Sequence, residues 1–149
     1  MSSSGSLFDT NVWIALSFAR HAGFERAREE FERHDSNHPI VVCRSVQQSF
    51  LRLITTKSIQ QAYQQELITN REAWTRWYEI LALPQVQWLD EPAGLESHWA
   101  KNAALDSASS KRWMDAYLGA FVLGHKIKLT TFDKAFISFK EVKVELLKA

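Results

Sequence analysis

The sequence contains little cysteine, little proline and no long apolar run. Cys43 is the only cysteine among 149 residues, which excludes an internal disulfide and favours a reducing compartment. Its position after the apolar pair Val41-Val42 indicates a buried structural thiol rather than a nucleophile. No apolar stretch approaches the roughly 20 residues that a membrane-spanning helix needs, so we expect a cytoplasmic protein with no membrane partner.

Internal repeats and low-complexity linkers are also absent from the sequence. A chain of 149 residues is long enough to bury one core, so we expect a single domain over residues 6–149. Residues 1–5 are small and polar, without the basic and apolar regions of a signal peptide. We expect them to form a disordered leader.

Charge is nearly balanced but unevenly distributed. The net charge is +1, whereas residues 101–149 hold nine Lys or Arg against five acids, a net of +4. This weakly basic part is suited to holding a polyanion, although scattered solvated lysines explain it equally well.

Apolar runs typical of strands alternate along the chain with helical patterns. This alternation predicts an α/β fold of three layers, with a central parallel sheet and helices on both faces. The expected strands cover residues 6–9, 40–43, 86–89, 127–130 and 142–146. The expected helices cover residues 22–33, 45–55, 63–83, 93–105 and 113–123, the last ended by Gly124.

Three aspartates stand where expected elements begin or end. Asp9 and Asp133 follow strands, and Asp115 lies near the start of an apolar helix. Functional sites of open parallel sheets form at the carboxyl ends of the strands, so the three carboxylates are expected to converge there. A divalent cation makes such a cluster of like charge tolerable. A turn or a cap explains each aspartate taken alone, and an ion pair with Lys111 or Arg112 is the alternative for Asp115.

The ordered set of motifs resembles the PIN domain, and within it the VapC-type toxin ribonucleases of bacterial toxin–antitoxin pairs. The resemblance covers nearly the whole chain. The matching segments are Phe8-Asp9-Thr10-Asn11-Val12-Trp13, Ser45-Val46-Gln47-Gln48-Ser49-Phe50-Leu51-Arg52-Leu53, Trp113-Met114-Asp115-Ala116-Tyr117-Leu118 and Thr130-Thr131-Phe132-Asp133-Lys134-Ala135-Phe136.

This resemblance implies an endoribonuclease in which Asp9, Asp115 and Asp133 bind Mg²⁺ or Mn²⁺. The metal would activate a water that attacks the scissile RNA phosphate. The resemblance also implies a cognate VapB-type antitoxin and a homodimer as partners.

Further residues beside the three acids are candidates for supporting roles. Thr10, Asn11 and Thr131 are candidates to orient Asp9, Asp133 or a water, although capping and turn formation explain them equally well. Four basic residues are candidates for binding RNA phosphates, with solvated surface charge as the alternative. They are Lys111, Arg112, Lys134 and Arg52.

The sequence departs from the family at one position. Many members carry a glutamate in the helix after the second strand, where this chain has Gln47, Gln48 and Ser49. Only three carboxylates are therefore transferred, which leaves the number of metals open. The departure also keeps a second reading open, a PIN-like module that binds RNA or protein without catalysis. A phosphatase with Asp9 as nucleophile is a third reading, but its usual second acid two residues later is replaced by Asn11.

Overall fold

A five-stranded parallel sheet forms the centre of the computed structural model, which describes residues 4–63 and 66–149. The strand order is β3-β2-β1-β4-β5, and every neighbouring pair is parallel. The expected α/β fold is confirmed, and each expected strand is present with its ends moved by at most two residues. The strands are β1 (Ser6–Phe8), β2 (Ile40–Val42), β3 (Val86–Trp88), β4 (Lys128–Thr131) and β5 (Val144–Leu146).

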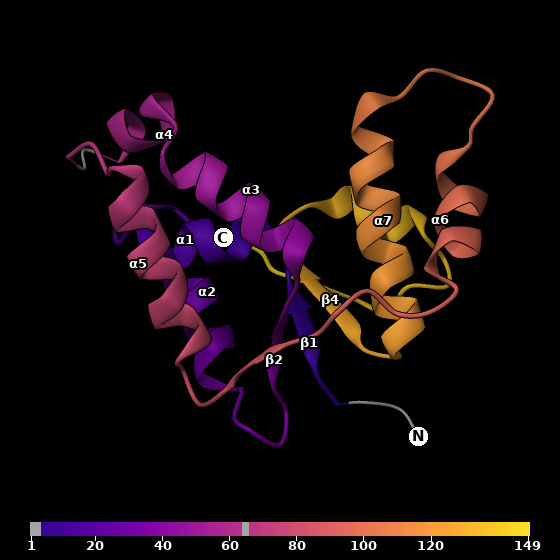
Figure 1. The fold of residues 1–149 in the computed structure, drawn as a ribbon, viewed down its shortest axis with the longest axis horizontal. Helices are drawn as coiled ribbons and strands as arrows, with labels where there is room; N and C mark the ends of the chain where they lie inside the picture. The colour runs from indigo at the N-terminus through magenta and orange to yellow at the C-terminus, as the bar shows by residue number, and fades with distance from the viewer. Residues whose placement is uncertain (1–3, 64–65) are drawn as a thin grey trace.

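Helices cover the sheet from two sides. In Figure 1, α1, α2 and α5 lie to one side of the strands, and α6 and α7 lie to the other. The helices are α1 (Thr10–Ser17), α2 (Phe24–Glu32), α3 (Arg44–Ile54), α4 (Lys57–Ala62), α5 (Asn70–Leu81), α6 (Leu95–Ala103) and α7 (Ser110–His125), with a short 3₁₀ helix η1 (Lys134–Ser138) after β4.

The central strands owe their position to their composition. All three residues of β1 and of β2 are buried, whereas the edge strands β3 and β5 are only partly buried. Short continuous runs such as Ile40-Val41-Val42 are typical of strands covered on both faces. This arrangement fixes β1 beside β4, with Phe8 opposite Thr130, and so brings the ends of these two strands together.

The helix expected over residues 63–83 is wrong at its start. Residues 64–65 lie outside the described part of the chain, α4 ends at Ala62, and α5 begins only at Asn70. The Thr69 hydroxyl accepts a hydrogen bond from the Glu72 N–H (3.1 Å), which caps α5. The buried Gln60 side chain binds the backbone of Ile68 instead of allowing a continuous helix. The apolar spacing was continuous here, but the local capping residues decided the boundary.

Two further expectations about helices are wrong. Gly124 does not end α7, which continues to His125 and is followed by Lys126 in the left-handed conformation (φ 57°). A Cβ at Gly124 would collide with the ring of Pro92, so this glycine serves close packing. The sequence also predicted no helix between the expected helices 45–55 and 63–83, where α4 begins at Lys57.

The first residues of the described chain are attached to the domain. Residues 1–3 of the expected leader lie outside the described part. The Ser4 hydroxyl donates to the Asn37 carbonyl (2.7 Å), and Gly5 is buried. Along the part of the chain that the structure describes, none of the helices combines the length and the apolar character needed to cross a bilayer.

Candidate active site

Asp9 lies at the junction of β1 and α1, at the carboxyl edge of the sheet. Its backbone N–H donates to the Thr130 carbonyl of the neighbouring strand (2.9 Å). Its Oδ1 accepts from the Thr10 N–H (2.7 Å), so the carboxylate caps α1. Capping is therefore part of the role of Asp9, and the cap aims the carboxylate toward the end of β4.

Thr131, the last residue of β4, connects the elements of the site. Its hydroxyl donates to Oδ2 of Asp9 (2.8 Å) and accepts from the side-chain amide of Asn11 (3.2 Å) and from the Asp133 N–H (3.0 Å). Asn11 in turn accepts from the Phe132 N–H (3.3 Å). The supporting residues expected from the sequence thus lie together, and the fully buried Thr131 is the centre of their network.

Asp133 and Asp115 are joined through a lysine. Asp133 caps η1, its Oδ1 accepting from the Ala135 N–H (2.9 Å). Lys111 Nζ lies 2.6 Å from Oδ2 of Asp115 and 2.6 Å from Oδ2 of Asp133. The Asp115 side chain is 16% exposed and that of Lys111 is 63% exposed, so α7 presents both at the rim of the site. The ion pair between Asp115 and Lys111, the alternative that the sequence left open, is present.

The electrostatics of the three carboxylates differ. Burial raises the pKa of Asp9 above its ordinary value, against the opposing hydrogen bonds from Thr131 and Thr10, and the charges of Asp115 and Asp133 raise it further. Partial burial alone would raise the pKa of Asp133 as well, but the Lys111 ammonium and the Ala135 N–H lower it below its ordinary value. The three acids therefore act on one another at this edge of the sheet.

The donor chemistry of this edge is suited to a hard divalent cation. Three carboxylates supply the oxygen ligands that Mg²⁺ and Mn²⁺ prefer, and a cation, the Lys111 ammonium, already lies between two of them. Within residues 4–63 and 66–149, no three acidic, His or Cys side chains are gathered at metal-binding distance. Movement of the Lys111 ammonium away from Asp115 and Asp133 would free ligand oxygens on both.

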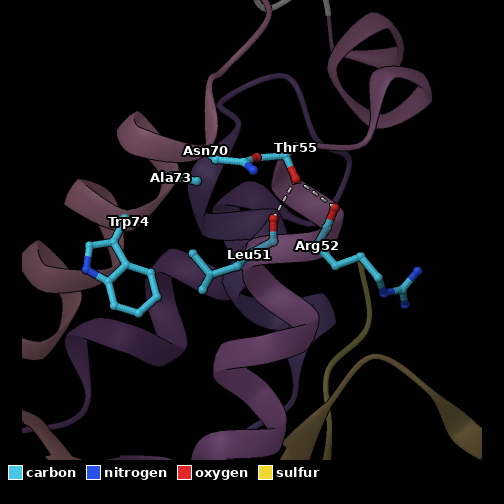
Figure 2. Close-up of a pocket in the computed structure, with 6 residues that line it drawn as sticks. All are labelled: Leu51, Arg52, Thr55, Asn70, Ala73 and Trp74. Atoms are coloured by element: carbon cyan, nitrogen blue, oxygen red, sulfur yellow. Dashed lines mark hydrogen bonds between the residues drawn. The ribbon is translucent and has the colours of Figure 1, made fainter.

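Of the four basic candidates, Arg112 has a structural role. Its Nε–H donates to the Asn102 carbonyl (2.7 Å), and its guanidinium lies 4.2 Å from the centre of the Phe139 ring. Lys134 is exposed on η1 beside Asp133. Arg52 is exposed on α3, and in Figure 2 its guanidinium extends away from the pocket that its backbone lines. Lys111 and Lys134 therefore lie beside the acids.

Gln47, which lies where many family members carry a glutamate, also makes a defined contact. Gln47, in the first turn of α3, is buried, and its amide oxygen accepts a hydrogen bond from Arg44. Arg44 also lies over the Trp88 ring, 4.8 Å from its centre. Sequence reasoning missed one acid, Glu91, which follows β3 and accepts from the Tyr117 hydroxyl (2.8 Å). Its only sequence signal was its position after a strand.

Known proteins are similar to this chain in sequence and in fold. Residues 6–142 match the model of the PIN domain family. The chain is 37% identical to Ribonuclease VapC41 of Mycobacterium tuberculosis over 142 residues, covering 95% of this chain and 97% of that protein.

Solved structures at much lower identity share the architecture. Mycobacterium tuberculosis VapC20, described as a Sarcin-Ricin loop cleaving toxin, has a TM-score of 0.68 at 16% identity, covering 96% of this chain and 99% of that one. The VapBC2 structure from Rickettsia felis, bound to a DNA fragment from their promoter, has a TM-score of 0.63 at 12% identity, covering 97% and 99%.

Proposed function

The chain belongs to the PIN domain family, and on this basis we propose that it is a toxin endoribonuclease that depends on Mg²⁺ or Mn²⁺. The observation that supports the proposal is the indirect linkage of three acids at one edge of the sheet: Thr131 connects Asp9 with Asp133, and Lys111 connects Asp133 with Asp115. The similarity to a named ribonuclease over 95% of the chain supports the same activity.

In this proposal each carboxylate is held by a different element. Thr10 and Thr131 fix both oxygens of Asp9, and the Ala135 N–H fixes one oxygen of Asp133. Asp115 approaches from α7 on the side of Lys111. When bound, a divalent ion would supply a Lewis acid for hydrolysis of a phosphodiester. Orientation by the fixed backbone of β1 and β4 reduces the reorganisation needed during the reaction.

Lys134 and the displaced side chain of Lys111 would provide contacts for RNA phosphates beside the acids. Arg52 is not assigned to this role, because no contact within the described part of the chain links its exposed side chain to the acids, and Arg112 serves the packing of α7. The proposed partner is a VapB-type antitoxin, because solved relatives include toxins in VapBC assemblies. A homodimer and a cytoplasmic location remain parts of the same proposal.

Exposed apolar side chains on α5 provide a candidate contact surface for a protein partner. Trp74 and Tyr78 on α5 are 45% and 58% exposed, whereas Trp77 is buried. Their rings meet edge to face, with centres 5.6 Å apart. Figure 2 shows Trp74 beside Leu51 at a pocket between α3 and α5. Exposed aromatic side chains of this kind are suited to contact with another protein.

A ribonuclease assay tests the activity. Purified protein is incubated with a mixture of structured RNAs and Mn²⁺, Mg²⁺ or EDTA, and the products are separated on gels. We expect cleavage with either metal and background cleavage with EDTA. Asp115→Asn should reduce cleavage to background, whereas Asp106→Asn neutralises an exposed loop acid that is not one of the three aspartates and serves as the matched control.

The alternative reading is a PIN-like module that binds RNA or protein without catalysis. It gains support from the Lys111 ammonium, which engages two of the three acids. Intact RNA in every metal condition, together with unchanged RNA binding by Asp115→Asn, would favour this module over the enzyme. The phosphatase reading gains no support, because the Asn11 side chain is used in binding Thr131 and Phe132.

A further inference from the structure

The Lys111 ammonium is bonded to carboxylate oxygens that a metal ion would need as ligands. It is bonded to Oδ2 of Asp115 and to Oδ2 of Asp133, at 2.6 Å in both cases. The other oxygen of Asp133 accepts from the Ala135 N–H. The oxygen of Asp133 that is free of the backbone is therefore the one bonded to Lys111.

We propose that Lys111 is a built-in counter-cation of Asp115 and Asp133, and that a divalent ion binds these two acids by displacing its ammonium. This inference rests on the proposed metal-dependent function and adds a residue that opposes metal binding. Two carboxylates that face one another repel, and an internal ammonium offsets that repulsion until a metal arrives. A metal that uses Oδ2 of Asp115 and Oδ2 of Asp133 would compete with the ammonium for these two oxygens.

The position of Lys111 on α7 explains how this exchange can occur. Lys111 lies one helical turn before Asp115, so its side chain reaches the acid without any change in the helix. The side chain is 63% exposed and flexible, which allows the ammonium to leave for solvent without rearrangement of the core. The carboxylates stay in place, because Asp133 is fixed by η1 and Asp115 by α7.

Competition of this kind predicts a measurable effect on metal affinity. The apparent affinity is reduced by the fraction of molecules in which the ammonium has left the acids. For two ion pairs of a largely exposed lysine, removal of the ammonium should tighten metal binding roughly three- to thirtyfold. A lysine that contributes only to general surface charge would give a much smaller change.

The test is isothermal titration of the metal-stripped protein with Mn²⁺, which needs no RNA and no turnover. Lys111→Gln should bind Mn²⁺ more tightly than the native chain and should melt at a lower temperature in EDTA. Lys111→Arg keeps the positive charge and should bind Mn²⁺ with nearly native affinity. Lys134→Gln removes the same charge from an exposed side chain beside Asp133 and should change the affinity less than about twofold.

The outcomes separate this inference from the function on which it rests. If native protein binds Mn²⁺ and Lys111→Gln binds it equally or more weakly, the counter-cation role is wrong while the metal site stands. The same conclusion follows if Lys134→Gln tightens binding as much as Lys111→Gln. If no variant binds Mn²⁺ at millimolar concentration, both the inference and the metal-dependent function fail.

Discussion

Replacing Thr131 with valine removes one hydroxyl group from the centre of the site and keeps the shape of the side chain. The hydroxyl donates to Asp9 and accepts from Asn11 and from the Asp133 N–H, and Thr131 is fully buried. Valine leaves no cavity, so a loss of stability would report the lost hydrogen bonds rather than lost packing. The variant therefore measures how strongly one group holds three parts of the site.

The magnitude follows from the kind of each bond. A hydrogen bond to an ionised group contributes about 1.5–3 kcal/mol, and one to a neutral backbone amide about 0.5–1.5 kcal/mol. The Asn11 amide is partly exposed and can turn to water, so its loss adds little. We expect the free energy of unfolding to fall by about 2–4 kcal/mol, which lowers the melting temperature by roughly 4–16 °C for a chain of this size.

Thr131→Val should also shift the pH dependence of metal binding. Burial raises the pKa of Asp9, and the Thr131 hydroxyl opposes this by stabilising the carboxylate. Without the hydroxyl the pKa rises further, so Asp9 stays protonated to a higher pH, and the acid limb of Mn²⁺ binding moves upward.

The assay consists of thermal melts and Mn²⁺ titrations at pH values from about 5 to about 8. This window covers the range in which loss of Mn²⁺ binding in acid is expected. Thr131→Ser keeps the hydroxyl, loses one methyl group and serves as the control. If valine and serine variants melt at the same temperature and lose Mn²⁺ at the same pH, Thr131 does not organise the site.

Two other variants test separate parts of the structure. Asp133→Asn keeps the cap of η1 but removes the charge that pairs with Lys111, so at neutral pH it should lose about 0.2–1 kcal/mol of stability in EDTA. Because the folded pKa of Asp133 lies below its ordinary value of 3.8, this difference should disappear as the pH falls through that lowered pKa, and a difference that persists in acid would contradict the ion-pair account. Gln60→Leu should destabilise the fold by about 2–4 kcal/mol in urea melts, because it leaves buried backbone groups of Ile54 and Ile68 without partners. The exposed neighbour Gln61→Leu is its control, and equal midpoints for both variants would show that Gln60 does not hold the turn before α5.

The sequence predicted the sheet well because its strands are short apolar runs with clear boundaries. Ile40-Val41-Val42 has no other reading than a buried strand, and the structure buries all three residues. The helix boundaries were harder, since apolar spacing continued through a real break. Thr69 and Glu72 form the capping pattern of α5, but the spacing of Trp74, Trp77 and Tyr78 obscured it.

The sequence predicted which residues form the site better than it predicted the contacts between them. The spacing of four residues suggested the pair of Lys111 with Asp115. No local pattern suggested the bond from Lys111 to Asp133, because these residues are 22 positions apart and meet only through the packing of α7 beside β4. The sequence explained Thr131 equally well as a turn former, because its contact with Asp9 also joins residues far apart in the chain. Its partner Asp9 lies 122 residues earlier and is placed by strand pairing alone.

The metal-free site avoids three bare negative charges through two devices. Burial favours the protonated form of Asp9, and Lys111 pairs with the other two acids. Because burial raises the pKa of Asp9, protons compete with a metal for this carboxylate more strongly than at an exposed aspartate. Metal binding should therefore strengthen as the pH rises through the pKa of Asp9. With Lys111 displaced, the three carboxylates carry a formal charge of −3 against +2 from the metal, which leaves the loaded site with a net charge of −1.

This charge balance gives a physical reason for the absence of a fourth acid. A further carboxylate would raise the net negative charge of the loaded site from −1 to −2, facing an RNA phosphate, unless a second metal entered. At position 47 the chain has instead a buried glutamine that accepts from Arg44. A glutamate introduced there would meet that arginine before it met a metal, so Gln47→Glu should form an ion pair with Arg44 and leave Mn²⁺ stoichiometry unchanged. Two Mn²⁺ ions per chain in calorimetry of this variant, against one in the native protein, would show that the fourth acid alone limits the metal count.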